Sequence, residues 1–129
     1  MPMKLLNNFF TIVGGNESCV HIRLHATHPV FRAHFPGNPI TPGACIVQAI
    51  GELLSVREGQ KLVLHRANSV KFVSPLKPQE QPVVSVVFQT VDHDDGGRVT
   101  AKGHIETNGD ISTKFALVFA EVMNFRTRQ

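Results

Sequence analysis

Alternating apolar and polar residues predict that most of the chain forms β-strands. Between residues 19 and 25, Val20, Ile22 and Leu24 alternate with polar positions, as in a strand with one buried face. Asn108-Gly109 indicates a tight hairpin, and the short turns between successive strands favour an antiparallel sheet. The other β-rich runs lie at residues 62–73, 83–91, 99–106 and 111–123, with residues 9–13 as an opening strand or the end of a helix.

One segment departs from this pattern and predicts a buried helix. Thr41 is a candidate N-cap and Pro42 a candidate first helical residue, so we expect a helix over residues 42–56 that ends before Gly59. Its apolar side chains go almost all the way round, which indicates a helix wrapped by other structure. They are Ala44, Cys45, Ile46, Val47, Ala49, Ile50, Leu53 and Leu54. Because residues 29–42 contain four prolines, we expect an extended loop before the helix.

These elements predict a single α+β domain over residues 1–129, with one buried helix packed against a curved antiparallel sheet. A single helix covers one face of such a sheet. We therefore expect a dimer in which the sheet is extended.

Composition narrows the classes of function. The formal net charge is +3, from 13 Lys and Arg against 10 Asp and Glu, which is too weak to indicate nucleic-acid binding but fits an acidic protein partner. Cys19 and Cys45 form no Cys-x-x-Cys pair, and the four histidines at positions 21, 25, 28 and 34 lack a nearby carboxylate or cysteine at metal-binding spacing. We expect no metal, and we expect these histidines to be solvated.

No segment predicts a membrane span. The longest uncharged stretch, residues 35–51, is broken by prolines and is too short to cross a bilayer. The first eight residues do not form a convincing signal peptide, so we expect a cytoplasmic protein.

Chemistry-bearing residues gather in residues 28–43. His34 lies on the proline-rich loop a few residues before the helix N-terminus, whose free N–H groups suit a carbonyl oxygen or a developing oxyanion. Gly43 would let a ligand approach this backbone closely. A histidine in that place suits proton abstraction next to a carbonyl, although these residues alone fit an ordinary loop histidine as well.

Residues 34–43, which read His-Phe-Pro-Gly-Asn-Pro-Ile-Thr-Pro-Gly and precede an apolar helix, resemble the 3-hydroxyacyl-acyl-carrier-protein dehydratases of fatty acid synthesis. The run Lys-Phe-Val-Ser-Pro at residues 71–75 agrees with this resemblance. It implies a hotdog fold, a homodimer, an acyl-carrier-protein-linked 3-hydroxyacyl substrate and no cofactor. It also implies that His34 is the catalytic base and that the Gly43 N–H binds the thioester carbonyl.

The chain departs from this family at the residue that protonates the leaving hydroxyl. The family has a helix carboxylate fourteen residues after the histidine, contributed across the dimer interface, and this chain has Gln48 there. Glu52 lies one helical turn further on, on the same helix face as Gln48. A well-placed general acid contributes roughly 100- to 10,000-fold in rate, and an amide cannot supply a proton.

Three hypotheses follow for the activity. The first is a dehydratase in which Glu52, or a water held by Gln48, serves the hydroxyl side. The second is an accessory protein that binds an acyl thioester without efficient elimination, and the third is an acyl thioesterase. Glu52 also fits a purely structural role, at a dimer interface or paired with Arg57 or Arg66.

Other residues have two interpretations each. Phe31, Phe35 and Pro42 are candidate substrate-binding residues, with Phe31 and Phe35 lining an acyl tunnel, and core packing explains the two phenylalanines equally well. Cys45 is better explained as a small apolar core residue than as a reactive thiol. Five cations are a candidate docking rim for an acidic carrier protein, namely Arg57, Lys61, Arg66, Lys71 and Lys77.

Overall fold

The computed structural model describes residues 4–33, 37 and 39–122. The first half of this region contains β1 (Phe10–Gly15), β2 (Cys19–Leu24), α1 (Val30–Ala33) and α2 (Gly43–Glu58). The second half contains β3 (Leu62–Phe72), β4 (Val83–His93), β5 (Arg98–Thr107) and β6 (Asp110–Glu121).

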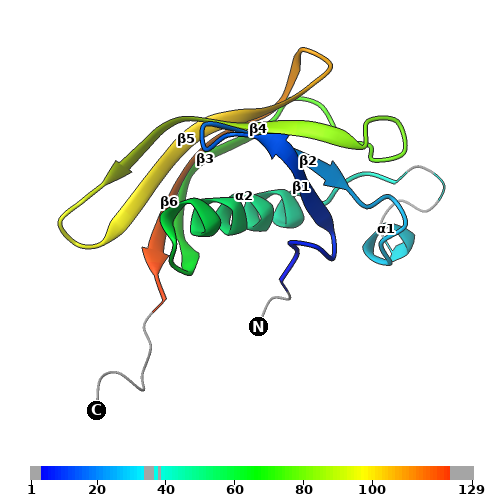
Figure 1. Ribbon diagram of the computed structural model, residues 1–129. Coiled ribbons are helices and arrows are strands. Elements are labelled where there is room, and N and C mark those ends of the chain that lie inside the picture. Colours follow the sequence, from blue (N-terminus) through cyan, green and yellow to red (C-terminus); the bar gives the residue numbers. More distant parts are fainter. Residues whose placement is uncertain (1–3, 34–36, 38, 123–129) are drawn as a thin grey trace.

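The six strands form one antiparallel sheet in the order β1-β2-β4-β5-β6-β3. The sheet curves, and α2 lies along its concave face (Figure 1). This confirms the predicted α+β architecture with one long helix against a curved antiparallel sheet. No helix in the described residues is long and apolar enough to cross a membrane.

The curvature of the sheet has a local cause at Gly103. The pairing of β4 with β5 shifts register between Phe88 and Thr90, directly beside the Phe88–Gly103 pair. A Cβ atom at Gly103 would lie 1.9 Å from the Val87 carbonyl oxygen. Bulges bend a strand and increase its twist, so glycine here allows the close backbone approach that the bend requires.

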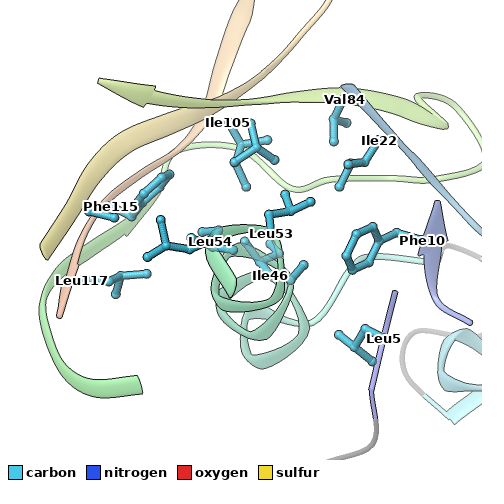
Figure 2. Close-up of a cluster of buried hydrophobic side chains, with 14 of the residues drawn as sticks. Leu5, Phe10, Ile22, Ile46, Leu53, Leu54, Val84, Ile105, Phe115 and Leu117 are labelled. Atoms are coloured by element: carbon cyan, nitrogen blue, oxygen red, sulfur yellow. The ribbon is translucent and has the colours of Figure 1, made fainter. Parts of the chain in front are cut away.

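The hydrophobic core lies between α2 and the sheet. Leu53 and Leu54 of the helix extend towards Ile105 and Phe115 of the sheet, as Figure 2 shows. Ile50 and Leu54 are fully buried. Because the helix is apolar around most of its circumference, other parts of the chain must cover it on more than one side.

Residues before β1 provide part of that cover. Leu5, Phe9 and Phe10 are 8, 1 and 0% exposed and belong to the same core cluster as the helix residues. Figure 2 shows Leu5 and Phe10 on the side of α2 away from Phe115 and Leu117. The N-terminal segment is thus an integral part of the domain core.

Two boundaries predicted from turn chemistry are confirmed. Gly59 ends α2 in the left-handed conformation, and its N–H bonds to the last turn of the helix. Asn108 and Gly109 have φ values of 52° and 84° and join β5 to β6, as a two-residue hairpin requires.

Two local predictions are wrong. A short helix, α1, interrupts the loop expected over residues 29–42, because its four residues fall between prolines and none of them is itself a proline. The N-cap of α2 is Pro42 and not Thr41, and the first helical residue is Gly43. Thr41 lies one residue before the N-cap, and its N–H donates to the Leu76 carbonyl at 2.8 Å, which ties it to another loop.

The tight packing around Gly51 predicts that one added methyl group there lowers the stability of the fold. A Cβ atom at this position would lie 2.9 Å from the Phe119 ring. Although alanine normally favours a helix over glycine, we expect Gly51→Ala to lower the free energy of unfolding by about 1–3 kcal/mol through overpacking. Chemical denaturation measures this change.

The matched control is Gly96→Ala, where the added Cβ would meet only the Asp94 side chain, at 3.4 Å. This control should stay within about 0.5 kcal/mol of the wild type. A Gly51→Ala protein as stable as the wild type would contradict the tight helix–sheet contact.

Candidate active site

The candidate site is built around the N-terminus of α2. Pro42 is half-buried and Gly43 is the first helical residue. The expected base His34 and the expected substrate-binding residue Phe35 lie outside the described residues. The geometry of the site therefore comes from the helix start and from the segments that contact it.

The first turn of α2 leaves backbone donors without helical acceptors. The Pro42 carbonyl accepts hydrogen bonds from the N–H groups of Cys45 and Ile46, at 3.0 and 3.1 Å. Gly43 and Ala44 precede these residues, so the helix itself provides no acceptor for their N–H groups. The N-cap residue, Pro42, makes no side-chain capping bond. Such a helix start suits a carbonyl oxygen on which negative charge develops.

A residue missed by sequence reasoning, Phe72, covers this helix start. A Cβ atom at Gly43 would lie 2.8 Å from the Phe72 ring, so the space left by the glycine is occupied by that ring. Phe72 is 52% exposed, which is unusual for a side chain of this size. We expected a ligand to approach the backbone closely at Gly43. In the structure the Phe72 ring of the same chain makes that close approach. The run at residues 71–75 was the sequence feature that pointed here.

Thr41 links the loop before α2 to the loop after β3. Besides the N–H bond to Leu76, its hydroxyl group is buried and has no hydrogen-bond partner among the described residues. Leu76 is itself 2% exposed. Residues 39–42 are therefore anchored to a buried part of the domain.

Phe31, the third aromatic candidate, lies in α1 and is buried. Its ring stacks on that of Phe9, with centroids 5.3 Å apart and planes at 27°. The described contacts of Phe31 are those of a core residue, and they place α1 against the N-terminal segment.

Gln48 and Glu52 are in direct contact on one face of α2. The Gln48 Nε2 donates a hydrogen bond to Glu52 Oε2 at 2.9 Å. The Glu52 carboxylate also accepts from the backbone N–H of Leu5, at 3.0 and 2.8 Å to its two oxygens, and from that of Leu6, at 2.7 Å. The sequence predicted the shared helix face but not the N-terminal partners.

The cations suggested as structural partners of Glu52 lie elsewhere. Arg57 bonds to the Glu17 carbonyl and approaches Glu58 at 3.9 Å, and Arg66 bonds to Asn68. Backbone N–H groups thus take the place that a cation was expected to fill.

The described histidines in and after β2, which we expected to be solvated, are half-exposed and each has a hydrogen-bond partner; that of His28 is the Val30 N–H, at 3.1 Å. His21 Nδ1 lies 2.8 Å from Ser85 Oγ on the neighbouring strand. His25 contacts Thr11 Oγ1 at 2.7 Å and the Asn8 carbonyl at 2.8 Å. Cross-strand pairing and the N-terminal segment supply partners that alternation alone does not reveal.

Cys45 lies in the first turn of α2 and is half-buried against the core. Burial raises the pKa of the Cys45 thiol. The raised pKa favours the protonated, unreactive form over the thiolate at neutral pH. This agrees with a packing role for Cys45 and gives no support to nucleophilic catalysis.

Comparison with known proteins identifies the family of this chain. Residues 12–107 match the ApeI-like family model, which describes ApeI dehydratases. A 3-hydroxyacyl-[acyl-carrier-protein] dehydratase FabZ of Thermoanaerobacter sp. is 25% identical over 125 residues, covering 92% of this chain and 86% of the relative.

Solved structures agree on the fold. The dehydratase heterocomplex ApeI:P from Xenorhabdus doucetiae superposes with a TM-score of 0.57 at 16% identity, over 82% of this chain and 90% of the other. A thioesterase, HI1161 from Haemophilus influenzae, gives 0.62 at 14% identity, over 90% and 80%. At these identities the structures establish the hotdog fold alone. The family match covers about three quarters of the sequence, and the chain belongs to the ApeI-like dehydratase family.

Proposed function

We propose that the protein dehydrates a 3-hydroxyacyl thioester carried by an acyl carrier protein and forms a trans-2-enoyl thioester. The observation that carries this proposal is the start of α2, where Gly43 opens a helix whose N-cap residue makes no side-chain capping bond, at the end of the motif that contains His34. Membership of a dehydratase family supports dehydration as the reaction that this arrangement serves.

In this proposal, the Gly43 N–H binds the thioester carbonyl oxygen and stabilises the negative charge that develops on it. His34 removes a proton from C2, the electron pair of that C–H bond forms the C2–C3 double bond, and the C3–O bond breaks. The hydroxyl group leaves as water after it receives a proton. Gln48, which contacts Glu52, serves the hydroxyl side of the substrate, and Phe35 and Pro42 line the acyl-binding region. Phe31 packs in the core.

We further propose that two copies pair along β3. This strand is an edge of the sheet, and its exposed residues include Val63, Leu64 and Phe72. A strand edge with unpaired backbone groups is a ready site for sheet extension. The expected mass in solution is twice that of one chain.

The second candidate is an accessory protein that binds an acyl thioester without efficient elimination. The observation that favours it is Gln48, an amide at the position where the related enzymes were expected to have a carboxylate. The kinetic experiment below separates the two functions.

Hydration of a trans-2-enoyl thioester, the reverse reaction, provides the test. We expect wild-type protein to hydrate it and His34→Ala to lower kcat/KM by about 100- to 10,000-fold, because the base is lost. His93→Ala is the matched control, since His93 contacts Glu58 near the other end of α2.

An inactive wild type that gains activity through Gln48→Glu would favour the accessory function. Equal activity of His34→Ala and wild type would refute the proposed role of His34.

The position of two lysines yields a prediction about carrier docking. Lys71 is exposed next to Phe72, whose ring lies on Gly43, and Lys77 follows Leu76, which bonds to Thr41. Both cations are therefore next in sequence to residues that contact the helix start or the loop before it. We expect the double substitution Lys71→Glu and Lys77→Glu to raise KM about tenfold for a carrier-linked substrate and to leave a carrier-free thioester unaffected.

Lys102→Glu is the control, because Lys102 is an exposed lysine of β5 that does not belong to the five candidate docking cations. Steady-state rates with both substrates measure the effect. An equal loss with the carrier-free thioester would show that the lysines act on the site itself and not on docking.

A further inference from the structure

The N-terminal segment contains a tight turn with two backbone donors at its start. The Leu5 carbonyl accepts hydrogen bonds from the N–H groups of Asn8, Phe9 and Phe10, at 3.0, 2.7 and 3.2 Å. The N–H groups of Leu5 and Leu6 precede these bonds, and no carbonyl of the turn accepts them. They resemble the free donors at the start of a helix, where a carboxylate is the favourable partner.

Glu52 supplies that carboxylate from α2, across 46 and 47 residues of sequence. Its Oε1 accepts from Leu5 and Leu6, and its Oε2 accepts from Leu5 and from Gln48. Both oxygens therefore face N–H donors. A proton on either oxygen would point towards a donor and would remove at least one of these hydrogen bonds.

The same contact determines the orientation of the Gln48 amide. An ionised carboxylate only accepts hydrogen bonds, so the NH2 group of Gln48 and not its carbonyl oxygen must face Glu52. This assigns the two ends of the amide by chemistry, and it directs the Gln48 carbonyl oxygen away from Glu52.

We propose that Glu52 is a positioning residue, which in its ionised form holds the turn at residues 5–10 against α2 and fixes the Gln48 amide, and that it is not the proton donor. The catalytic part of this inference rests on the proposed dehydratase function. With Glu52 ionised, the proton for the leaving hydroxyl is the one that His34 removed from C2. The imidazolium donates that proton to the hydroxyl oxygen, the C3–O bond breaks, and water leaves.

The ionisation of Glu52 is tested on the wild-type protein by carboxyl 13C NMR, with the Glu52 signal assigned from Glu52→Gln. We expect the signal of an ionised carboxylate at neutral pH. We also expect slow hydrogen exchange at the Leu5 and Leu6 amides. A Glu52 carboxyl that is protonated at neutral pH would overturn the proposal.

The positioning role is tested by kinetics on Glu52→Gln, Gln48→Ala and the double variant. Replacing Glu52 by glutamine sets an NH2 group against existing donors, so we expect about a tenfold loss of kcat, the size expected for one lost charge-assisted hydrogen bond. Gln48→Ala should give a similar loss, and the double variant should lose no more than either single variant. The pH profile should keep its shape.

A proton donor would behave differently. Glu52→Gln would then lower kcat by about 100- to 10,000-fold, remove one limb of the pH profile and act independently of Gln48. That result would overturn the proposal. Glu58→Gln is the matched control, because Glu58 lies in the same helix and contacts His93 and Arg57 rather than Gln48.

Failure of the dehydratase function is distinguishable from failure of this inference. An inactive wild type refutes the function and the catalytic part together, while the 13C signal and the Leu5 and Leu6 amides still decide whether Glu52 is the ionised anchor. If Glu52→Gln does not fold, Gln48→Ala and the wild-type spectra decide the same question, with the Glu52 signal assigned from through-bond correlations.

Discussion

The burial of an almost entirely apolar helix is the constraint on which the rest of this structure depends. Helix α2 has apolar residues around most of its circumference, and leaving them in water would cost about 25 cal/mol per Å2 of apolar surface. The curved sheet covers one side, with Phe115 and Leu117 among the contacts, and Leu5 and Phe10 cover another (Figure 2). Two further features help to bury the helix. The bulge beside Gly103 lets the sheet bend, and the glycine at position 51 lets the sheet approach the helix.

This constraint also determines where polar chemistry can occur. In a helix with so little polar surface, a glutamate needs partners, and Glu52 finds them in the backbone of the N-terminal turn and in Gln48. The helix start, in contrast, has no capping side chain among the residues that the structure describes, and it lies beneath the half-exposed ring of Phe72. The structure thus separates an anchoring carboxylate from a helix N-terminus that suits a polarised carbonyl group.

Local patterns in the sequence were sufficient for much of the fold. Strand alternation, the Asn108-Gly109 hairpin and Gly59 as the helix end depend on near neighbours, and each was predicted. The partners of Glu52, the Phe72 ring on Gly43 and the Thr41 bond to Leu76 join residues that are distant in sequence. Because no periodicity encodes such contacts, they became visible only in three dimensions. The role of His34 stays a prediction from its motif.

The central claim is that the start of α2 binds the thioester carbonyl while Glu52 stays in its anchoring contacts. A crystal structure with a non-reactive amide analogue of a 3-hydroxyacyl thioester tests both parts at once. We predict a carbonyl oxygen about 2.7–3.1 Å from the Gly43 nitrogen, the distance of an oxyanion-type contact, with Glu52 still accepting from Leu5 and Leu6. An analogue whose carbonyl lies away from Gly43, or a Glu52 side chain turned to the substrate hydroxyl, would contradict the account.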